Sequence, residues 1–84
     1  MKKENRLILY IWYTRQSLYA QIIDNQIGEI ITSAHSTRNE REKLAAKLAL
    51  RCLAVGVFFL RFKGKYKGGI VRIIDLLNKF GIVI

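Results

Sequence analysis

The chain has 84 residues, of which 15 are Lys or Arg and six are Asp or Glu, giving a formal net charge of +9 at pH 7. This length leaves room for one domain, spanning residues 1–84. Hydrophobic residues make up 51% of the sequence, which excludes a disordered chain, because such chains combine high net charge with few apolar residues. The longest apolar run, residues 52–60, is too short to cross a bilayer, and the first residues are charged rather than apolar. We therefore expect no membrane segment and no secretion signal.

Three consecutive strands are predicted in the first part of the chain, over residues 6–15, 17–24 and 29–34. All three are rich in β-branched and aromatic residues, which favour a pleated sheet. Arg15 and Gln16 separate the first two strands and predict a tight hairpin, although neither residue is glycine. The Asp, Asn and Gly between the second and third strands favour another turn. The segment should therefore form a meander.

An amphipathic helix is predicted next. Residues 36–39 supply candidate helix caps, and the helix should continue to about Val55 and end near Gly56. Apolar residues recur at spacings of three and four on one face, which predicts packing. A second face carries cations at a spacing of four: Lys43, Lys47 and Arg51.

The remaining residues predict one more strand and one more helix. Residues 57–62 favour a mostly buried fourth strand, and residues 63–69 form a glycine-rich basic loop. A second amphipathic helix should run from Ile70 to Phe80 and end at Gly81, before a short strand at 82–84. The order βββαβα(β) predicts the α+β class, with two helices packed on a mixed sheet.

Positive charge is concentrated in two regions. Residues 38–51 carry five basic against two acidic side chains, and residues 61–79 carry six against one. From Arg61 through Arg72 there is no acidic residue, and Tyr66 lies between lysines and close to glycines. Ammonium groups neutralise phosphates, an aromatic ring can stack on an unpaired base, and glycines permit close approach of the backbone. This pattern predicts an RNA-binding surface, with a solvated basic loop that contributes only solubility as the alternative.

Catalytic and metal-binding chemistry is not indicated. The six acidic residues are scattered, so a carboxylate cluster for metal-assisted cleavage is not expected. His35 has no Cys or His at ligand spacing, and the single Cys52 is expected to be a buried thiol in a reducing compartment. We predict a non-enzymatic protein with no cofactor, no metal site and no small-molecule substrate.

Several segments carry a resemblance to a known family. Residues 18–24 read Leu-Tyr-Ala-Gln-Ile-Ile-Asp, and residues 28–37 read Gly-Glu-Ile-Ile-Thr-Ser-Ala-His-Ser-Thr. With Arg6-Leu7 before them and the loop of residues 59–69 after them, they resemble large-subunit ribosomal protein eighteen, whose members bind 5S rRNA. The loop departs from the family pattern at three positions: Leu60 replaces Asp, Lys67 replaces His and Gly69 replaces Arg.

The resemblance implies a structural constituent of the large ribosomal subunit, which binds 5S rRNA or its structural replacement in the central protuberance. The implied partners are 5S rRNA, adjoining large-subunit rRNA and neighbouring large-subunit proteins. The expected phosphate-binding and stacking residues are Arg61, Lys63, Lys65, Tyr66, Lys67 and Gly68. Weaker candidates are Lys43, Lys47, Arg51 and Arg15. Further candidates are Lys2 and Lys3 in the remnant of a basic amino-terminal arm at residues 1–5, together with Arg6, which follows it directly.

Location and function each have alternatives. The short arm and the bias towards Ile and Lys favour a mitochondrial ribosome, with the bacterial cytoplasm or a plastid as alternatives. The first alternative function is that of an rRNA-binding protein similar to small-subunit ribosomal protein eleven. The second is that of a non-ribosomal RNA or protein interaction module that uses an exposed strand edge and the aromatic residues Tyr10, Trp12 and Tyr13.

Overall fold

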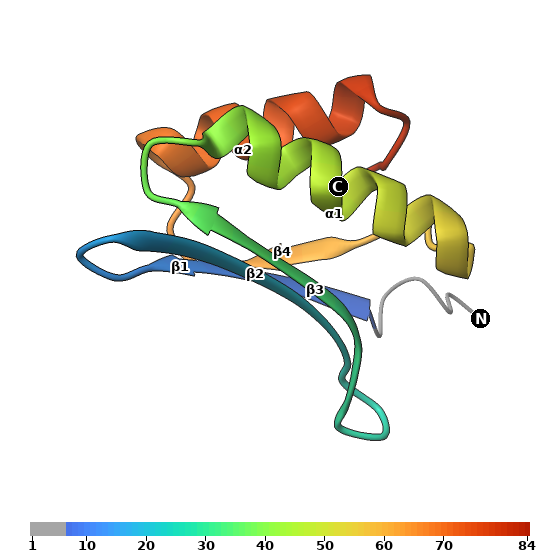
Figure 1. Cartoon of the computed structure of the whole chain (residues 1–84). Helices are drawn as coiled ribbons and strands as arrows, with labels where there is room; N and C mark the ends of the chain where they lie inside the picture. The colour runs from blue at the N-terminus through green and yellow to red at the C-terminus, as the bar shows by residue number, and fades with distance from the viewer. Residues whose placement is uncertain (1–6) are drawn as a thin grey trace.

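The fold is a four-stranded sheet covered on one face by two helices (Figure 1). It is seen in a computed structural model, which describes residues 7–84. The elements in chain order are β1 (Leu7–Tyr13), β2 (Ser17–Asp24), β3 (Glu29–Thr37), α1 (Arg41–Val55), β4 (Arg61–Lys63) and α2 (Gly69–Lys79). The predicted α+β class and the βββαβα order are confirmed.

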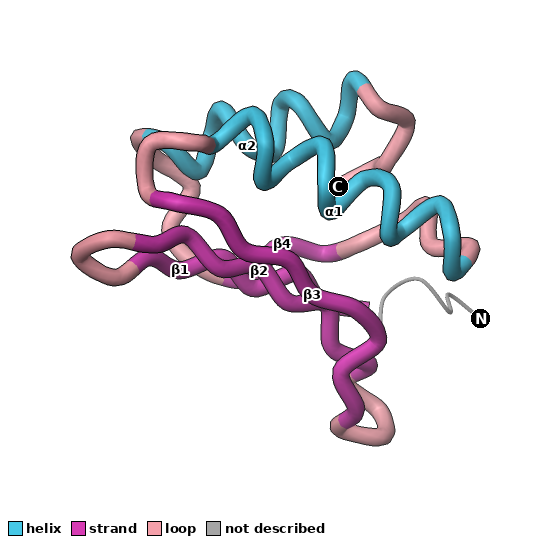
Figure 2. Tube along the Cα trace, viewed as in Figure 1, coloured by secondary structure: helices cyan, strands magenta, loops and turns pink. Residues whose placement is uncertain are grey.

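The sheet is mixed, with strand order β3-β2-β1-β4. Strands β1 and β2 pair antiparallel, as do β2 and β3, whereas β4 joins β1 in parallel. Strand β1 is therefore an internal strand, so its aromatic residues Tyr10, Trp12 and Tyr13 do not lie at an edge of the described sheet. Both helices lie on the same side of the sheet (Figure 2).

The core lies between the sheet and the helices. Alternate residues of β2, including Leu18, Ala20 and Ile22, are buried, because successive side chains of a strand point to opposite faces. They pack against the buried faces of the two helices, which include Leu48 and Ile73. Full burial of one such aliphatic side chain contributes about 1.5–3 kcal/mol.

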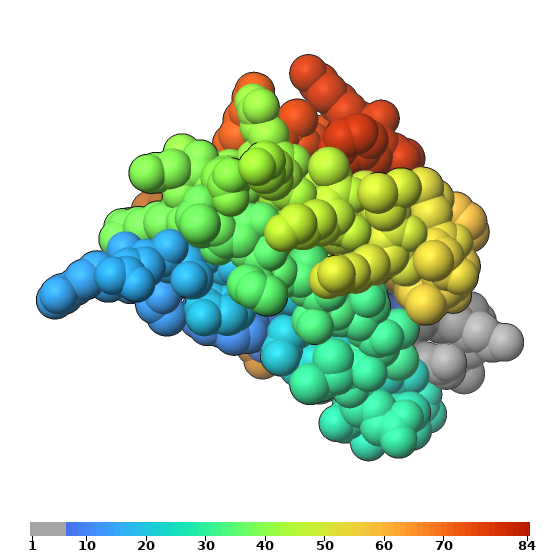
Figure 3. Space-filling model, in the orientation of Figure 1, coloured from blue at the N-terminus to red at the C-terminus, as the bar shows by residue number. Residues whose placement is uncertain are grey.

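The tight hairpin between β1 and β2 is confirmed. The Thr14 amide donates to the Ser17 carbonyl at 2.9 Å, and the Ser17 amide donates to Thr14 Oγ1 at 3.2 Å. These bonds close the turn around Arg15 and Gln16. The tip of this hairpin and the turn between β2 and β3 project from the body of the molecule (Figure 3).

The predicted fourth strand over residues 57–62 is wrong in extent. Only Arg61–Lys63 pair with β1. Phe58 and Phe59 are 46% and 50% exposed instead of buried. Phe59 forms an isolated parallel bridge with Val83, so the strand predicted at 82–84 is reduced to one bridge.

The predicted start of the first helix is also wrong in detail. Ser36 and Thr37 belong to β3, because their backbone pairs with Leu18 and Ser17 of β2. The N-cap of α1 is Glu40, without a side-chain capping bond. The predicted end is confirmed, since Gly56 adopts φ 75° and its amide closes the last turn.

Candidate nucleic-acid interface

Residues 61–69, which we call the basic segment, comprise β4, the loop that leads into α2 and the first residue of that helix. The side chains of Arg61, Lys63, Lys65 and Lys67 are all exposed. Among residues 7–84, the ion pairs are Lys43 with Glu40 and Arg72 with Glu42. None of the four cations of the basic segment is paired with a described carboxylate, so their charges are free to meet an anionic ligand.

Tyr66 and Gly68 lie within the same segment. The Tyr66 ring is 56% exposed, and its hydroxyl donates to Asp75 Oδ1 of α2 at 3.5 Å, which keeps the ring near the helix. Gly68 is the N-cap of α2 with φ 62°, a backbone conformation that favours glycine. The structure therefore brings together all six of the main predicted site residues.

Arg41 joins the basic segment from the start of α1. A Cβ atom at Gly69 would overlap the Arg41 guanidinium, so the missing side chain at Gly69 makes room for this arginine. Sequence reasoning expected Gly69 to allow a close approach of RNA, and it missed Arg41, because the two residues are far apart in the chain.

Arg38 was also missed. Its guanidinium carbon lies 4.7 Å from the centre of the Tyr13 ring, a cation–π contact. It shares with Arg41 a small hollow of about 70 Å³ beside the first turn of α2. Their spacing in the sequence could not predict this arrangement, because the folded structure brings together residues from β1, the start of α1 and the start of α2.

The cations of α1 have a different environment. Lys43 Nζ lies 2.8 Å from Glu40 Oε2, and this contact raises the pKa of Lys43 and lowers the pKa of Glu40. Lys47 Nζ donates to the His35 carbonyl at 3.0 Å, and Arg51 donates to the Ser33 carbonyl. Lys47 and Arg51 therefore bind β3, which forms the edge of the described sheet opposite to β4. The structure does not bring these two cations together with the basic segment.

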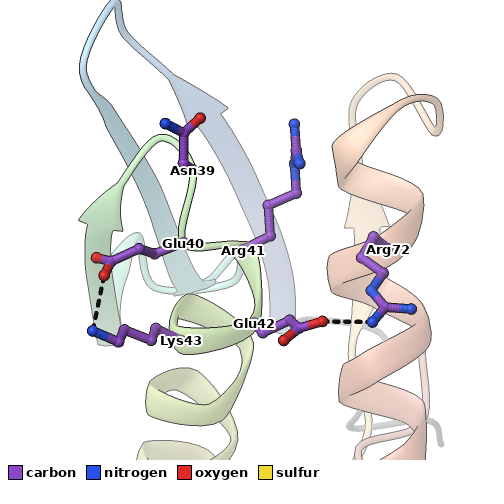
Figure 4. A pocket seen from close by; sticks show the side chains of 6 residues that line it. All are labelled: Asn39, Glu40, Arg41, Glu42, Lys43 and Arg72. Atoms are coloured by element: carbon purple, nitrogen blue, oxygen red, sulfur yellow. Dashed lines mark hydrogen bonds and ion pairs between the residues drawn. The ribbon is translucent and has the colours of Figure 1, made fainter.

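A surface hollow of about 320 Å³ lies between the start of α1 and α2 (Figure 4). The Arg72 guanidinium crosses to Glu42 at 2.5 Å and links the two helices. Of the three cations that line this hollow, Lys43 and Arg72 already form ion pairs. The hollow is therefore a weaker candidate for binding an anion than the basic segment. Its lining residues are Asn39, Glu40, Arg41, Glu42, Lys43 and Arg72.

The remaining candidates lie elsewhere. Arg15 is exposed at the tip of the β1–β2 hairpin, and Lys2, Lys3 and Arg6 lie outside the described residues. Cys52 is buried in α1, and burial raises the pKa of its thiol to about 11. Within residues 7–84, no three His, Cys, Asp or Glu side chains gather as a metal site would require, and no helix is long and apolar enough to span a membrane.

The fold and the exposed cations define a small basic α+β domain with a surface suited to polyanions. No family model matches the chain. It is 30% identical over 95 residues to the large ribosomal subunit protein uL18c of Cyanidioschyzon merolae, an alignment that covers 99% of this chain and 87% of that protein. The chain belongs to the uL18 family of ribosomal proteins, and the resemblance described above is confirmed.

Family membership implies a structural, non-enzymatic role in the large ribosomal subunit, with rRNA and ribosomal proteins as partners. It implies location in a ribosome. The prediction of a mitochondrial ribosome is not supported, because the relative is a plastid protein.

Proposed function

We propose that the protein is a structural constituent of the large ribosomal subunit that binds 5S rRNA, or its structural replacement, in the central protuberance. The basic segment is the phosphate-binding surface. The observation that carries the proposal is that its four cations are exposed and unpaired within residues 7–84, whereas three cations of α1 are bound within the fold. The plastid relative supports a plastid ribosome among the locations considered.

The mechanism is neutralisation of the RNA backbone. Lysines act as point charges on phosphates and release counterions, while Arg61 can contact two phosphate oxygens at once. Lysine contacts carry little base information, so recognition depends mainly on the shape of the folded RNA. Arg41, which lies over Gly69, extends the same cationic surface onto α1.

The first test is a filter-binding titration of the full chain with 5S rRNA at several salt concentrations. If four cations meet phosphates, the logarithm of the affinity should fall with the logarithm of the salt concentration with a slope of about 3 to 4. A flat salt dependence would refute phosphate neutralisation.

The second test compares two double variants with the same change in net charge. Lys65→Glu with Lys67→Glu should weaken 5S rRNA binding by about 2–4 kcal/mol, through the loss of two charge-assisted contacts and added repulsion. Lys43→Glu with Lys79→Glu, which changes two exposed cations of the helices, is the matched control. An equal loss of 5S rRNA affinity in the two variants would show that binding depends only on the total charge of the chain. Circular dichroism verifies that both variants fold.

A further inference from the structure

The sheet face opposite the helices carries a ladder of three aromatic rings. The Trp12 ring stacks on Tyr19 with 5.4 Å between centroids and 15° between planes. Tyr19 in turn stacks on His35 at 5.9 Å and 22°. The three residues occupy one register row across β1, β2 and β3, so the stack runs from strand to strand. Within residues 7–84, neither helix covers this face (Figure 1).

The ladder has free ring faces only at its ends. Both faces of Tyr19 are occupied by its neighbours, so the unstacked face of Trp12 is directed towards the β4 side of the sheet. Strand β4 ends at Lys63, which pairs with Tyr10, so no β4 residue reaches the row of Trp12. Trp12 is accordingly 40% exposed, and one face of its ring has no stacked partner within residues 7–84.

The charges around Trp12 are positive. Lys63 is the register neighbour of Tyr10, so its side chain projects on the same face as Trp12. The neighbouring row carries Gln21 and Ser33, which can donate to or accept from nucleotide groups.

The described carboxylates are remote from Trp12. Glu40, Glu42 and Asp75 belong to the helical layer. Asp24 is five residues along β2 from Tyr19, about 17 Å away, and Glu29 is its register partner on β3. No described acidic group therefore opposes an anion at this end of the ladder.

We propose that Trp12 is a stacking site for an unpaired RNA base, with Lys63 at the phosphate of that nucleotide. The occupant is a single-stranded or looped-out segment of rRNA, because a free aromatic face beside a cation suits a base and its phosphate together. The inference rests on the proposed function and extends it from the backbone to the bases. Paired bases are already stacked within a helix and cannot use this site.

Trp12 is the only tryptophan of the chain, so its fluorescence reports directly on the site. We would titrate the full chain with oligoadenylate of about eight nucleotides, a length within the range that single-strand-binding sites cover. Base stacking should quench the emission at saturation. The same strand annealed to its complement should bind in a salt-dependent way with little quenching. Binding of the single strand, measured by anisotropy, with unchanged Trp12 emission would overturn the proposal.

The matched variants are Trp12→Leu and Phe80→Leu, which remove two partly exposed aromatic rings, one from β1 and the other from the C-cap of α2 in the helical layer. Trp12→Leu should reduce the affinity for labelled oligoadenylate about tenfold or more, because stacking on one aromatic ring has that magnitude. Phe80→Leu should leave the affinity within about twofold of the unsubstituted chain. If both variants fold and bind the oligonucleotide equally, the site is not at Trp12.

Two further outcomes distinguish base stacking from self-association and from phosphate binding at the basic segment. A change in Trp12 emission with protein concentration alone would assign the face to a second copy of the chain and overturn the proposal. The variant Lys65→Glu with Lys67→Glu should still show quenching by saturating oligoadenylate. If the unsubstituted chain shows quenching by oligoadenylate but does not bind 5S rRNA, the proposed function is wrong and the stacking site remains. If it binds 5S rRNA and oligoadenylate leaves the Trp12 emission unchanged, the stacking site alone is wrong.

Discussion

The cations of α1 and those of the basic segment look equivalent in the sequence and differ in the structure. On α1, Lys47 and Arg51 donate to backbone carbonyls of β3, and Lys43 pairs with Glu40. In the basic segment, none of the four cations forms an ion pair with a described carboxylate. Net charge therefore does not locate a binding surface, because a cation that already stabilises the fold would have to give up that contact to bind RNA.

The same comparison assigns different roles to the two regions. Helix α1 is a structural element whose substitution should change the stability of the domain. The basic segment is exposed and forms few internal contacts through its side chains, so its substitution should change RNA binding. The expected effects below are ordered by size.

The largest effect is expected on the apolar face of α1. Leu48 is fully buried between the helix and the sheet. Leu48→Ala should lower the free energy of unfolding by about 2–5 kcal/mol, through lost burial and a residual cavity. Urea denaturation followed by circular dichroism measures this change. A loss below about 0.5 kcal/mol would contradict the structural role of α1.

A paired substitution of one cation from each region sharpens the comparison. Arg51→Met removes the donor to the Ser33 carbonyl and should cost about 1 kcal/mol of stability with little change in the affinity for 5S rRNA. Lys63→Met should change stability by less than about 0.5 kcal/mol and lower the salt slope of RNA binding by about 1. If denaturation showed the larger stability loss for Lys63→Met and filter binding showed the larger change in RNA affinity for Arg51→Met, the roles of the two regions would be reversed.

The smallest effect is expected where the two helices meet. Glu42 and Arg72 form an ion pair between side chains that are 70% and 55% exposed. Glu42→Gln should therefore cost about 0.5 kcal/mol or less. It also releases Arg72, which should slightly increase the affinity for 5S rRNA at low salt. A large loss of stability in a thermal melt would show that this contact holds α1 and α2 together.

The sequence predicted the elements whose signals are local. The dense β-branched and aromatic residues of β1 and β2 predicted a hairpin around Arg15 and Gln16, and Gly56 predicted the end of α1. The start of α1 was missed because pairing with β2 extends β3 through Thr37, at the expense of the local capping preference. Likewise, β4 forms only where β1 offers a partner, and apolar composition alone could not reveal how few residues pair.

The candidate site was predicted where its residues are contiguous. Arg61, Lys63, Lys65, Tyr66 and Lys67 are close together in the sequence, so their common surface follows from the loop itself. Arg41 was not found because it reaches Gly69 only after α1 and α2 have packed. The cationic stripe of α1 followed from helical periodicity, but periodicity could not show that its second and third members contact β3.

Those contacts with β3 also affect how the protein behaves before it joins a larger assembly. Among the described strands, β3 has a neighbour on one side only, so its outward carbonyls could template a strand from another molecule. Lys47 and Arg51 occupy two of the β3 carbonyls and place positive charge along the border of the sheet. Newly synthesised copies of the chain should therefore resist aggregation through intermolecular β-pairing before they are assembled.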